Sequence, residues 1–136
     1  MRIIGLDLGE KRIGVAAADD RALVALPIAT IEADGDAVGA IGRLVEEQQA
    51  EEVVVGLPLS MSGAMGPQAQ RVIDVVEALR GRLRVPVQTW DERLTTVQAN
   101  RSLGASRRGG REPRGARDAI AATIMLQAYL DSRRSA

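Results

Sequence analysis

The order of strand-like and helix-like segments constrains the fold of this chain most. Three apolar segments, at residues 2–8, 12–19 and about 22–31, are joined by short turns and predict an antiparallel meander. After them, helical and strand patterns alternate to the end of the chain. This order predicts an α/β fold: a five-stranded mixed sheet with helices on both faces, in which the first strand is central.

The later segments have recognisable ends. Asp34 or Asp36 is expected to cap a helix that runs to about residue 49. Gly81 is expected to end a second helix that starts after a loop at residues 58–67. Strands are predicted at 53–57 and 85–90, a short helix at 95–103 and a last helix at about 114–131. With 136 residues, the chain is expected to be a single domain, 1–136, without a membrane span or signal peptide.

Asp7 interrupts the apolar first strand. Ile4, Leu6 and Leu8 alternate on one face, so Asp7 falls on the other face, next to Gly5. A carboxylate in such a strand costs several kcal/mol unless it is paired or holds a cation. Asp7 is therefore either a candidate functional residue or a structural cap of the following turn.

Composition excludes several kinds of site. The chain has no histidine and no cysteine, which rules out a histidine-based triad, disulfides and thiolate or imidazole metal sites. Oxygen ligands remain, and they suit Mg²⁺ or Mn²⁺. Trp90 and Tyr129 are the only aromatic residues, which argues against a base-stacking platform of aromatic side chains.

Two further acids are expected near Asp7. Asp91 and Glu92 end the fifth predicted strand, and the two residues point to opposite faces, so either one is a candidate. Asp118 shares a helical face with Ala121, Ala122 and Met125, which directs it toward the protein. An aspartate favoured by the helix dipole is the structural alternative for Asp118. Three carboxylates from separate elements suit a two-metal phosphodiesterase.

Basic residues are clustered although the net charge is zero. Residues 101–117 contain six arginines and one acid, together with four glycines and a proline, which predicts a mobile loop suited to phosphates. A solvated loop without a ligand is the alternative. The residues expected to contact nucleic acid are Lys11, Arg12, Arg93, Arg107, Arg108, Arg111 and Arg114.

Motifs along the whole chain resemble one family. They are Ile4–Gly9 with Lys11–Ala16, the Gly-Leu-Pro-Leu run at 56–59, Asp-Glu-Arg-Leu-Thr-Thr at 91–96, Asp-Ala-Ile-Ala-Ala at 118–122 and Leu126–Asp131. In this order they resemble the YqgF (RuvX) family of pre-16S rRNA nucleases and Holliday junction resolvase-like proteins.

The resemblance implies an RNase H-like fold with catalytic, metal-binding acids at Asp7, Glu92 and Asp118. It implies a divalent-metal-dependent nuclease that matures the 5′ end of 16S rRNA in the bacterial cytoplasm. The sequence shows no clear dimer face, and a monomer or weak dimer is expected. Two positions depart from the family pattern. Glu10 replaces a usual threonine, and Ser62 stands where relatives have an aspartate.

Three other functions stay open. A Holliday junction or branched-DNA resolvase shares the chemistry and differs in substrate. A non-catalytic RNA-binding ribosome-assembly factor would need the arginines but not the acids. An actin-like ATPase would need a second domain, for which 136 residues leave no room.

Overall fold

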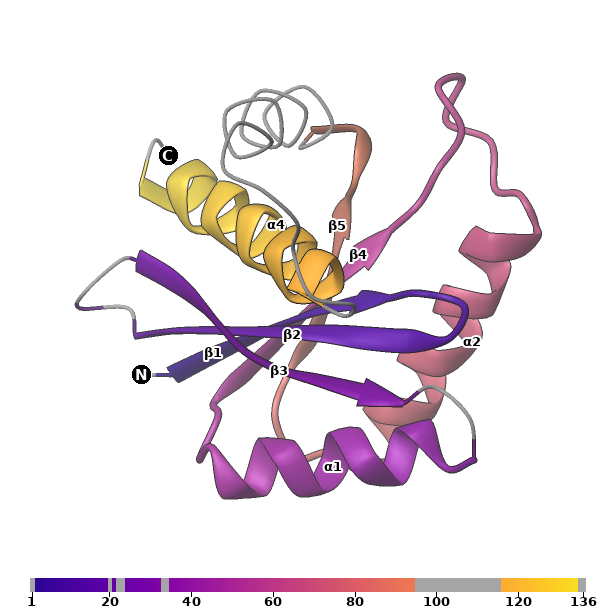
Figure 1. Cartoon of the computed structure of the whole chain (residues 1–136). Helices are drawn as coiled ribbons and strands as arrows, with labels where there is room; N and C mark the ends of the chain where they lie inside the picture. Colours follow the sequence, from indigo (N-terminus) through magenta and orange to yellow (C-terminus); the bar gives the residue numbers. More distant parts are fainter. Residues whose placement is uncertain (1, 20, 22–23, 33–34, 95–115, 135–136) are drawn as a thin grey trace.

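The computed structural model describes residues 2–19, 21, 24–32, 35–94 and 116–134. They form a five-stranded sheet of order β3-β2-β1-β4-β5 (Figure 1). The first three strands form the predicted antiparallel meander, whereas β4 runs parallel to β1 and β5 parallel to β4. The strands are β1 (Arg2–Leu8), β2 (Arg12–Asp19), β3 (Val24–Glu32), β4 (Glu52–Leu57) and β5 (Val87–Asp91). The mixed sheet and the central position of β1 are thus confirmed.

Helices cover both faces of the sheet, as predicted. Helices α1 (Ala37–Glu47) and α2 (Pro67–Arg82) pack on one face, and α4 (Ala116–Arg134) packs on the other (Figure 1). Two apolar cores result, because alternate residues of each buried strand point to opposite faces. The first core holds Ile4, Leu6, Val53, Val55, Ile41, Val72 and Val76, and the second holds Ile3, Val54, Ala122, Met125 and Leu126.

The face to which Asp7 belongs follows from this alternation. Leu6 and Leu8 lie in the core under α1 and α2, so Gly5 and Asp7 face α4. A Cβ on Gly5 would lie 2.9 Å from the Cβ of Leu126, closer than carbon atoms normally approach. Gly5 therefore allows α4 to pack closely on β1, and Asp7 lies one step further along the same face.

Some predicted boundaries are corrected. Asp36 is the N-cap of α1, accepting a hydrogen bond of 2.9 Å from the backbone N–H of Gly39. Gly81 does not end α2, which continues to Arg82 before Leu83 leaves the helix and packs against the first core. The reason is that Gly81 does not adopt the positive φ of a glycine cap.

The strand and helix ends near the C-terminus also differ from the prediction. β5 begins at Val87 instead of residue 85, and the carbonyl of Pro86 accepts a bond of 3.0 Å from Val53 N–H. α4 ends at Arg134 instead of residue 131. The helix predicted at 95–103 and the predicted start at residue 114 lie outside the described residues. Among the helices described, none is long and apolar enough to cross a membrane.

Candidate active site

Asp7 and Glu92 meet at the carboxyl edge of the three parallel strands. Asp7 is the penultimate residue of β1, and Glu92 directly follows β5. These strands are separated by β4, so Glu92 must cross β4 to reach Asp7. It crosses at Gly56, where a Cβ would lie 2.5 Å from the Glu92 Oε1 atom. The side chains of Asp7 and Glu92 are hydrogen-bonded to each other.

Two acids in hydrogen-bond contact cannot both be ionised at low cost. Burial raises the pKa of Asp7, and the negative charge of Asp118 raises it further, although the hydrogen bond from Glu92 acts in the opposite direction. Burial and then the charge of Asp7 raise the pKa of Glu92 to about 8. The pair therefore retains a proton at neutral pH when no cation is bound, and it titrates as one coupled unit.

Asp118 is brought to the same region from α4. Its charge acts on Asp7, and its Oδ1 atom would lie 3.8 Å from a Cβ on Gly9. The α4 backbone lies directly on β2 here, because a Cβ on Gly14 would overlap the carbonyl oxygen of Asp118. Gly14 is thus required for the position of Asp118. The predicted helix face is partly wrong, since Ala121 is exposed while Ala122 and Met125 are buried.

The arrangement can accept a divalent cation but is not a complete three-ligand site. No three Asp, Glu, His or Cys side chains within the part of the chain that the structure describes are grouped closely enough to hold a metal ion. Asp7 and Glu92 form the close pair, and Asp118 interacts with Asp7 through charge. Carboxylate oxygens are ligands that hard cations such as Mg²⁺ prefer, and a cation would relieve the repulsion between these acids.

The structure distinguishes Asp91 from Glu92. Asp91 is bound by Arg93, with 2.6 Å between Arg93 Nη2 and Asp91 Oδ2 and 3.0 Å between Arg93 Nε and Asp91 Oδ1. This hydrogen bonding lowers the pKa of Asp91. Glu92 is therefore the member of the two that joins Asp7, whereas Asp91 orients an arginine.

The predicted basic residues have different surroundings. Lys11 is exposed at the turn after β1, and Arg12 lies 3.9 Å from Glu32 between Nε and Oε1. Arg93 already forms an ion pair with Asp91 and donates a hydrogen bond of 3.3 Å to the carbonyl of Met61. The remaining predicted contacts lie outside the described residues: Arg107, Arg108, Arg111 and Arg114.

The two positions that depart from the family pattern lie at this end of the sheet. Glu10 is exposed next to Lys11. The Ser62 hydroxyl lies 2.9 Å from that of Ser60 and supplies no carboxylate.

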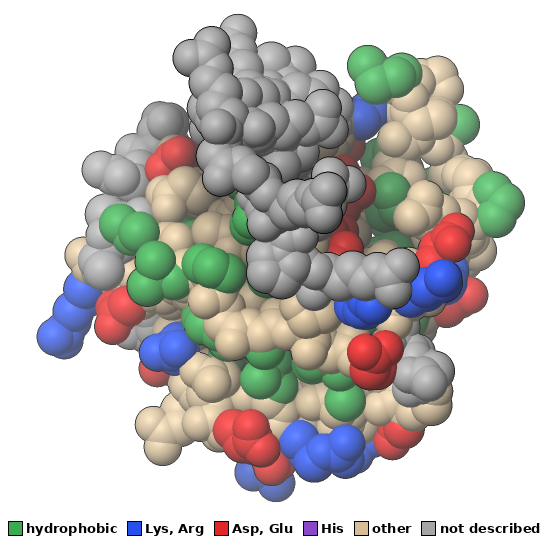
Figure 2. Space-filling model, viewed as in Figure 1, with side chains coloured by type: hydrophobic (Ala, Val, Ile, Leu, Met, Phe, Trp, Pro, Cys, Tyr) green, Lys and Arg blue, Asp and Glu red, His purple; other side chains and the backbone are tan. Residues whose placement is uncertain are grey.

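Arg71 is a residue at this edge that sequence reasoning missed. It is half-buried on α2 and donates a hydrogen bond to the carbonyl of Gly9, two residues after Asp7. No spacing in the sequence marks it. Only the topology could have indicated Arg71. Helix α2 begins at the carboxyl edge of β4, so its first turns lie near the site. On the face seen in Figure 2, acidic side chains lie in a recess beside the loop that follows β4.

Comparison with known proteins identifies the family of this chain. The family model described as "RuvX: Holliday junction resolvase" matches residues 1–132. The chain belongs to the RuvX family. A family relative from Caldanaerobacter subterraneus subsp. tengcongensis, named "Putative pre-16S rRNA nuclease", is 47% identical and covers 99% of both chains. The predicted family is therefore confirmed.

Solved structures show the same fold at low sequence identity. RuvC from T. thermophilus in complex with a Holliday junction has a TM-score of 0.65 at 19% identity, covering 98% of this RuvX-family chain and 96% of that chain. The fowlpox virus resolvase bound to Holliday junction DNA has a TM-score of 0.63 at 13% identity, covering 98% and 99%. The predicted RNase H-like fold is confirmed.

Proposed function

We propose that this RuvX-family chain is a divalent-metal-dependent nuclease that hydrolyses phosphodiester bonds, with Asp7, Glu92 and Asp118 as its metal ligands. Asp7 and Glu92 are already in contact, and Asp118 would move toward them when the cation binds. The observation that carries the proposal is the contact between Asp7 and Glu92. Glu92 crosses a whole strand at a glycine to reach a second buried acid, and the pKa values of both acids are raised. Such a costly arrangement is typical of functional sites.

The residues of the site have separate roles in this proposal. Asp7 and Glu92 would give up their shared proton and hold Mg²⁺ or Mn²⁺ together with Asp118. A bound divalent cation supplies positive charge that activates water and stabilises the leaving oxygen. Lys11, Arg12 and Arg93, with the arginines at 107, 108, 111 and 114, would neutralise substrate phosphates.

The proposed substrate is the 5′ end of pre-16S rRNA. The support is the name of the relative that shares 47% identity over almost its whole length. Processing of rRNA takes place where ribosomes are assembled, so the proposal places the protein in the cytoplasm, as a monomer or weak dimer. A branched-DNA resolvase is the second candidate, favoured by the description of the matching family model.

Cleavage of paired substrates by the pure protein tests these candidates. Pre-16S rRNA and a four-way DNA junction should be incubated with Mg²⁺, with Mn²⁺ and with EDTA. We expect cleavage of the rRNA that requires metal and is lost in Asp7→Asn, which keeps the shape but not the charge. The exposed Glu51→Gln is the matched control and should remain active.

Each alternative has its own result in this assay. Cleavage of the junction alone would support the resolvase. Tight RNA binding by wild-type protein and Asp7→Asn alike, without cleavage by either, would support the non-catalytic assembly factor.

A further inference from the structure

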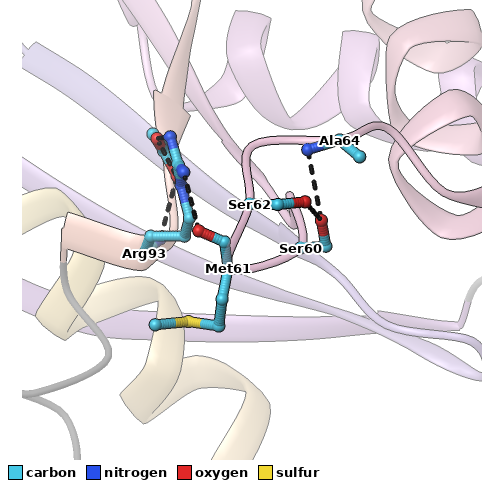
Figure 3. Close-up of polar contacts among 6 residues, drawn as sticks. Ser60, Met61, Ser62, Ala64 and Arg93 are labelled. Atoms are coloured by element: carbon cyan, nitrogen blue, oxygen red, sulfur yellow. Dashed lines mark hydrogen bonds and ion pairs between the residues drawn. The ribbon is translucent and has the colours of Figure 1, made fainter.

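The loop after β4 has a defined conformation. In this loop, residues 58–66, Gly63 N–H donates to the carbonyl of Ser60 at 2.8 Å, and Ser60 N–H donates to the carbonyl of Ala64 at 3.1 Å. The Ser60 hydroxyl accepts from Ala64 N–H at 3.1 Å (Figure 3). Gly63 has a φ of 87°, a conformation that costs little only for glycine. These bonds fix how the loop presents its side chains.

The same loop is tied to the candidate active site. The backbone N–H of Glu92 donates to the carbonyl of Leu57 at 3.0 Å, immediately before the loop begins. Arg93, held by Asp91, donates to the carbonyl of Met61, and a Cβ on Gly63 would lie 3.3 Å from Arg93 Nη1. Arg93, the residue next to Glu92, therefore helps to position Met61, so a molecule bound at Glu92 would lie next to this loop.

The chemical character of the loop is unusual for this chain. Residues 58–70 carry no charged side chain, although 26% of all residues are charged. Met61 is 85% exposed and Met65 52% exposed. Figure 3 shows the Met61 side chain extending away from the Ser60–Ser62 contact. The loop thus holds an apolar, polarisable side chain in solvent beside the candidate active site.

We propose that Met61 packs against an unstacked base of a single-stranded nucleic acid next to the scissile phosphate. The inference rests on the proposed function, because the nearby acids of the proposed nuclease site are the reason for choosing nucleic acid as the ligand. Bases of single strands can leave their stack and lie against side chains, and methionine sulfur interacts favourably with aromatic rings. An uncharged loop suits the base side of the strand, whereas the arginines suit its phosphates.

The test measures RNA affinity after removal of the Met61 side chain, after removal of one base, and after both changes together. Affinities of wild type and Met61→Ser are measured in EDTA, which prevents cleavage, for a short single-stranded RNA and for the same RNA with one base removed at each position in turn. We expect Met61→Ser to weaken binding to intact RNA about three- to tenfold. Removal of one particular base should abolish the difference between the two proteins.

Two further variants control the cycle. Leu26→Ser removes an exposed apolar side chain, 60% accessible, from β3 at the opposite edge of the sheet, and should leave the affinity unchanged. Gly63→Ala keeps Met61 but displaces the loop, and should weaken binding as Met61→Ser does. Because Met61 is exposed, the melting temperature of Met61→Ser should equal that of wild type.

Several outcomes overturn the inference. One is an equal affinity of wild type and Met61→Ser for intact RNA, and another is a loss that persists whichever base is removed. A change in self-association without a change in RNA affinity would make the loop an interface between copies of the chain.

Failure of the proposed function gives a different result. A base-dependent Met61 effect in a protein that never cleaves with Mg²⁺ or Mn²⁺ would remove the nuclease and retain the RNA contact. Absence of any nucleic-acid binding by wild type would remove both.

Discussion

Replacement of Glu92 by glutamine should stabilise the protein in the absence of metal. In the folded chain, burial and the charge of Asp7 raise the pKa of Glu92 from 4.5 to about 8. Between these two pH values, Glu92 keeps its proton in the folded chain but has lost it in the unfolded chain. Folding must then take up a proton, which lowers the stability of the folded protein. Glutamine does not titrate, and its amide group can still donate a hydrogen bond to Asp7.

The size of the effect follows from the same values. The interval between pKa 4.5 and about 8 corresponds to about 5 kcal/mol for an unscreened group. Because Glu92 is only half-buried, solvent screening reduces this figure, and we expect a gain of about 1–2 kcal/mol. For a domain of this size, such a gain raises the melting temperature by about 3–8 °C.

The pH dependence gives the prediction its sign. When folding raises the pKa of a carboxyl group, the folded protein becomes less stable as pH rises from the unfolded pKa to the folded pKa. The advantage of Glu92→Gln should therefore be absent below about pH 4.5, grow up to about pH 8 and stay constant above it.

Thermal unfolding in EDTA across this range measures the advantage, with the exposed Glu51→Gln as the control. Added Mg²⁺ should stabilise wild type more than Glu92→Gln. An advantage that does not depend on pH, or a less stable Glu92→Gln, would refute the assignment of Asp7 and Glu92 as a repulsive pair.

Other parts of the molecule give further predictions. Tyr129 is the only tyrosine of the chain. Burial together with its hydrogen bond to Glu52 raises its pKa to about 12. Ultraviolet titration of the folded protein should therefore show the phenolate form only near that pH. A transition near the ordinary value of about 10 would contradict that contact. Glu52 is buried and also binds Arg133 at 2.9 Å, so Glu52→Ala should cost about 2–3 kcal/mol in chemical denaturation, whereas Glu47→Ala on the surface should cost much less. Gly14→Ala should lower stability by about 1–3 kcal/mol and abolish cleavage by displacing Asp118, whereas Gly81→Ala, with open space around it, should do neither. Replacing Arg107, Arg108 and Arg111 by alanine should flatten the log–log dependence of RNA affinity on salt by about 2, alike for different sequences, and an unchanged slope would exclude these arginines from phosphate contact.

Much of the fold was predictable because strand alternation and element order are properties of the chain itself. Ile4, Leu6 and Leu8 identified one face of β1, which placed Asp7 on the other face with α4. The meander and the later crossovers likewise placed β1 at the centre of the sheet. The sequence did not determine which side of a helix is buried or at which residue a helix ends. Ala121 and Gly81 were misassigned because only packing decides which side of a helix is covered and where the helix stops.

The candidate site was predictable as a set of residue types but not as a geometry. The strand pattern did not distinguish Asp91 from Glu92, and only the family resemblance favoured Glu92. The structure shows Asp91 bound to Arg93 and Glu92 hydrogen-bonded to Asp7. The crossing at Gly56 depends on three strands at once, and no local pattern indicates it. The same holds for Arg71 and for Met61, whose positions depend on contacts between segments distant in the sequence.

The position of a bound cation tests the central claim most directly. Crystals of the protein grown with Mn²⁺ should be measured at the manganese absorption edge, because the anomalous signal locates this ion independently of any fitted side chain. The account predicts a peak in contact with the carboxylate oxygens of Asp7 and Glu92 on the side of Asp118, and no such peak in Asp7→Asn. A peak elsewhere, or Asp7 and Glu92 still paired with each other at saturating Mn²⁺, would contradict it.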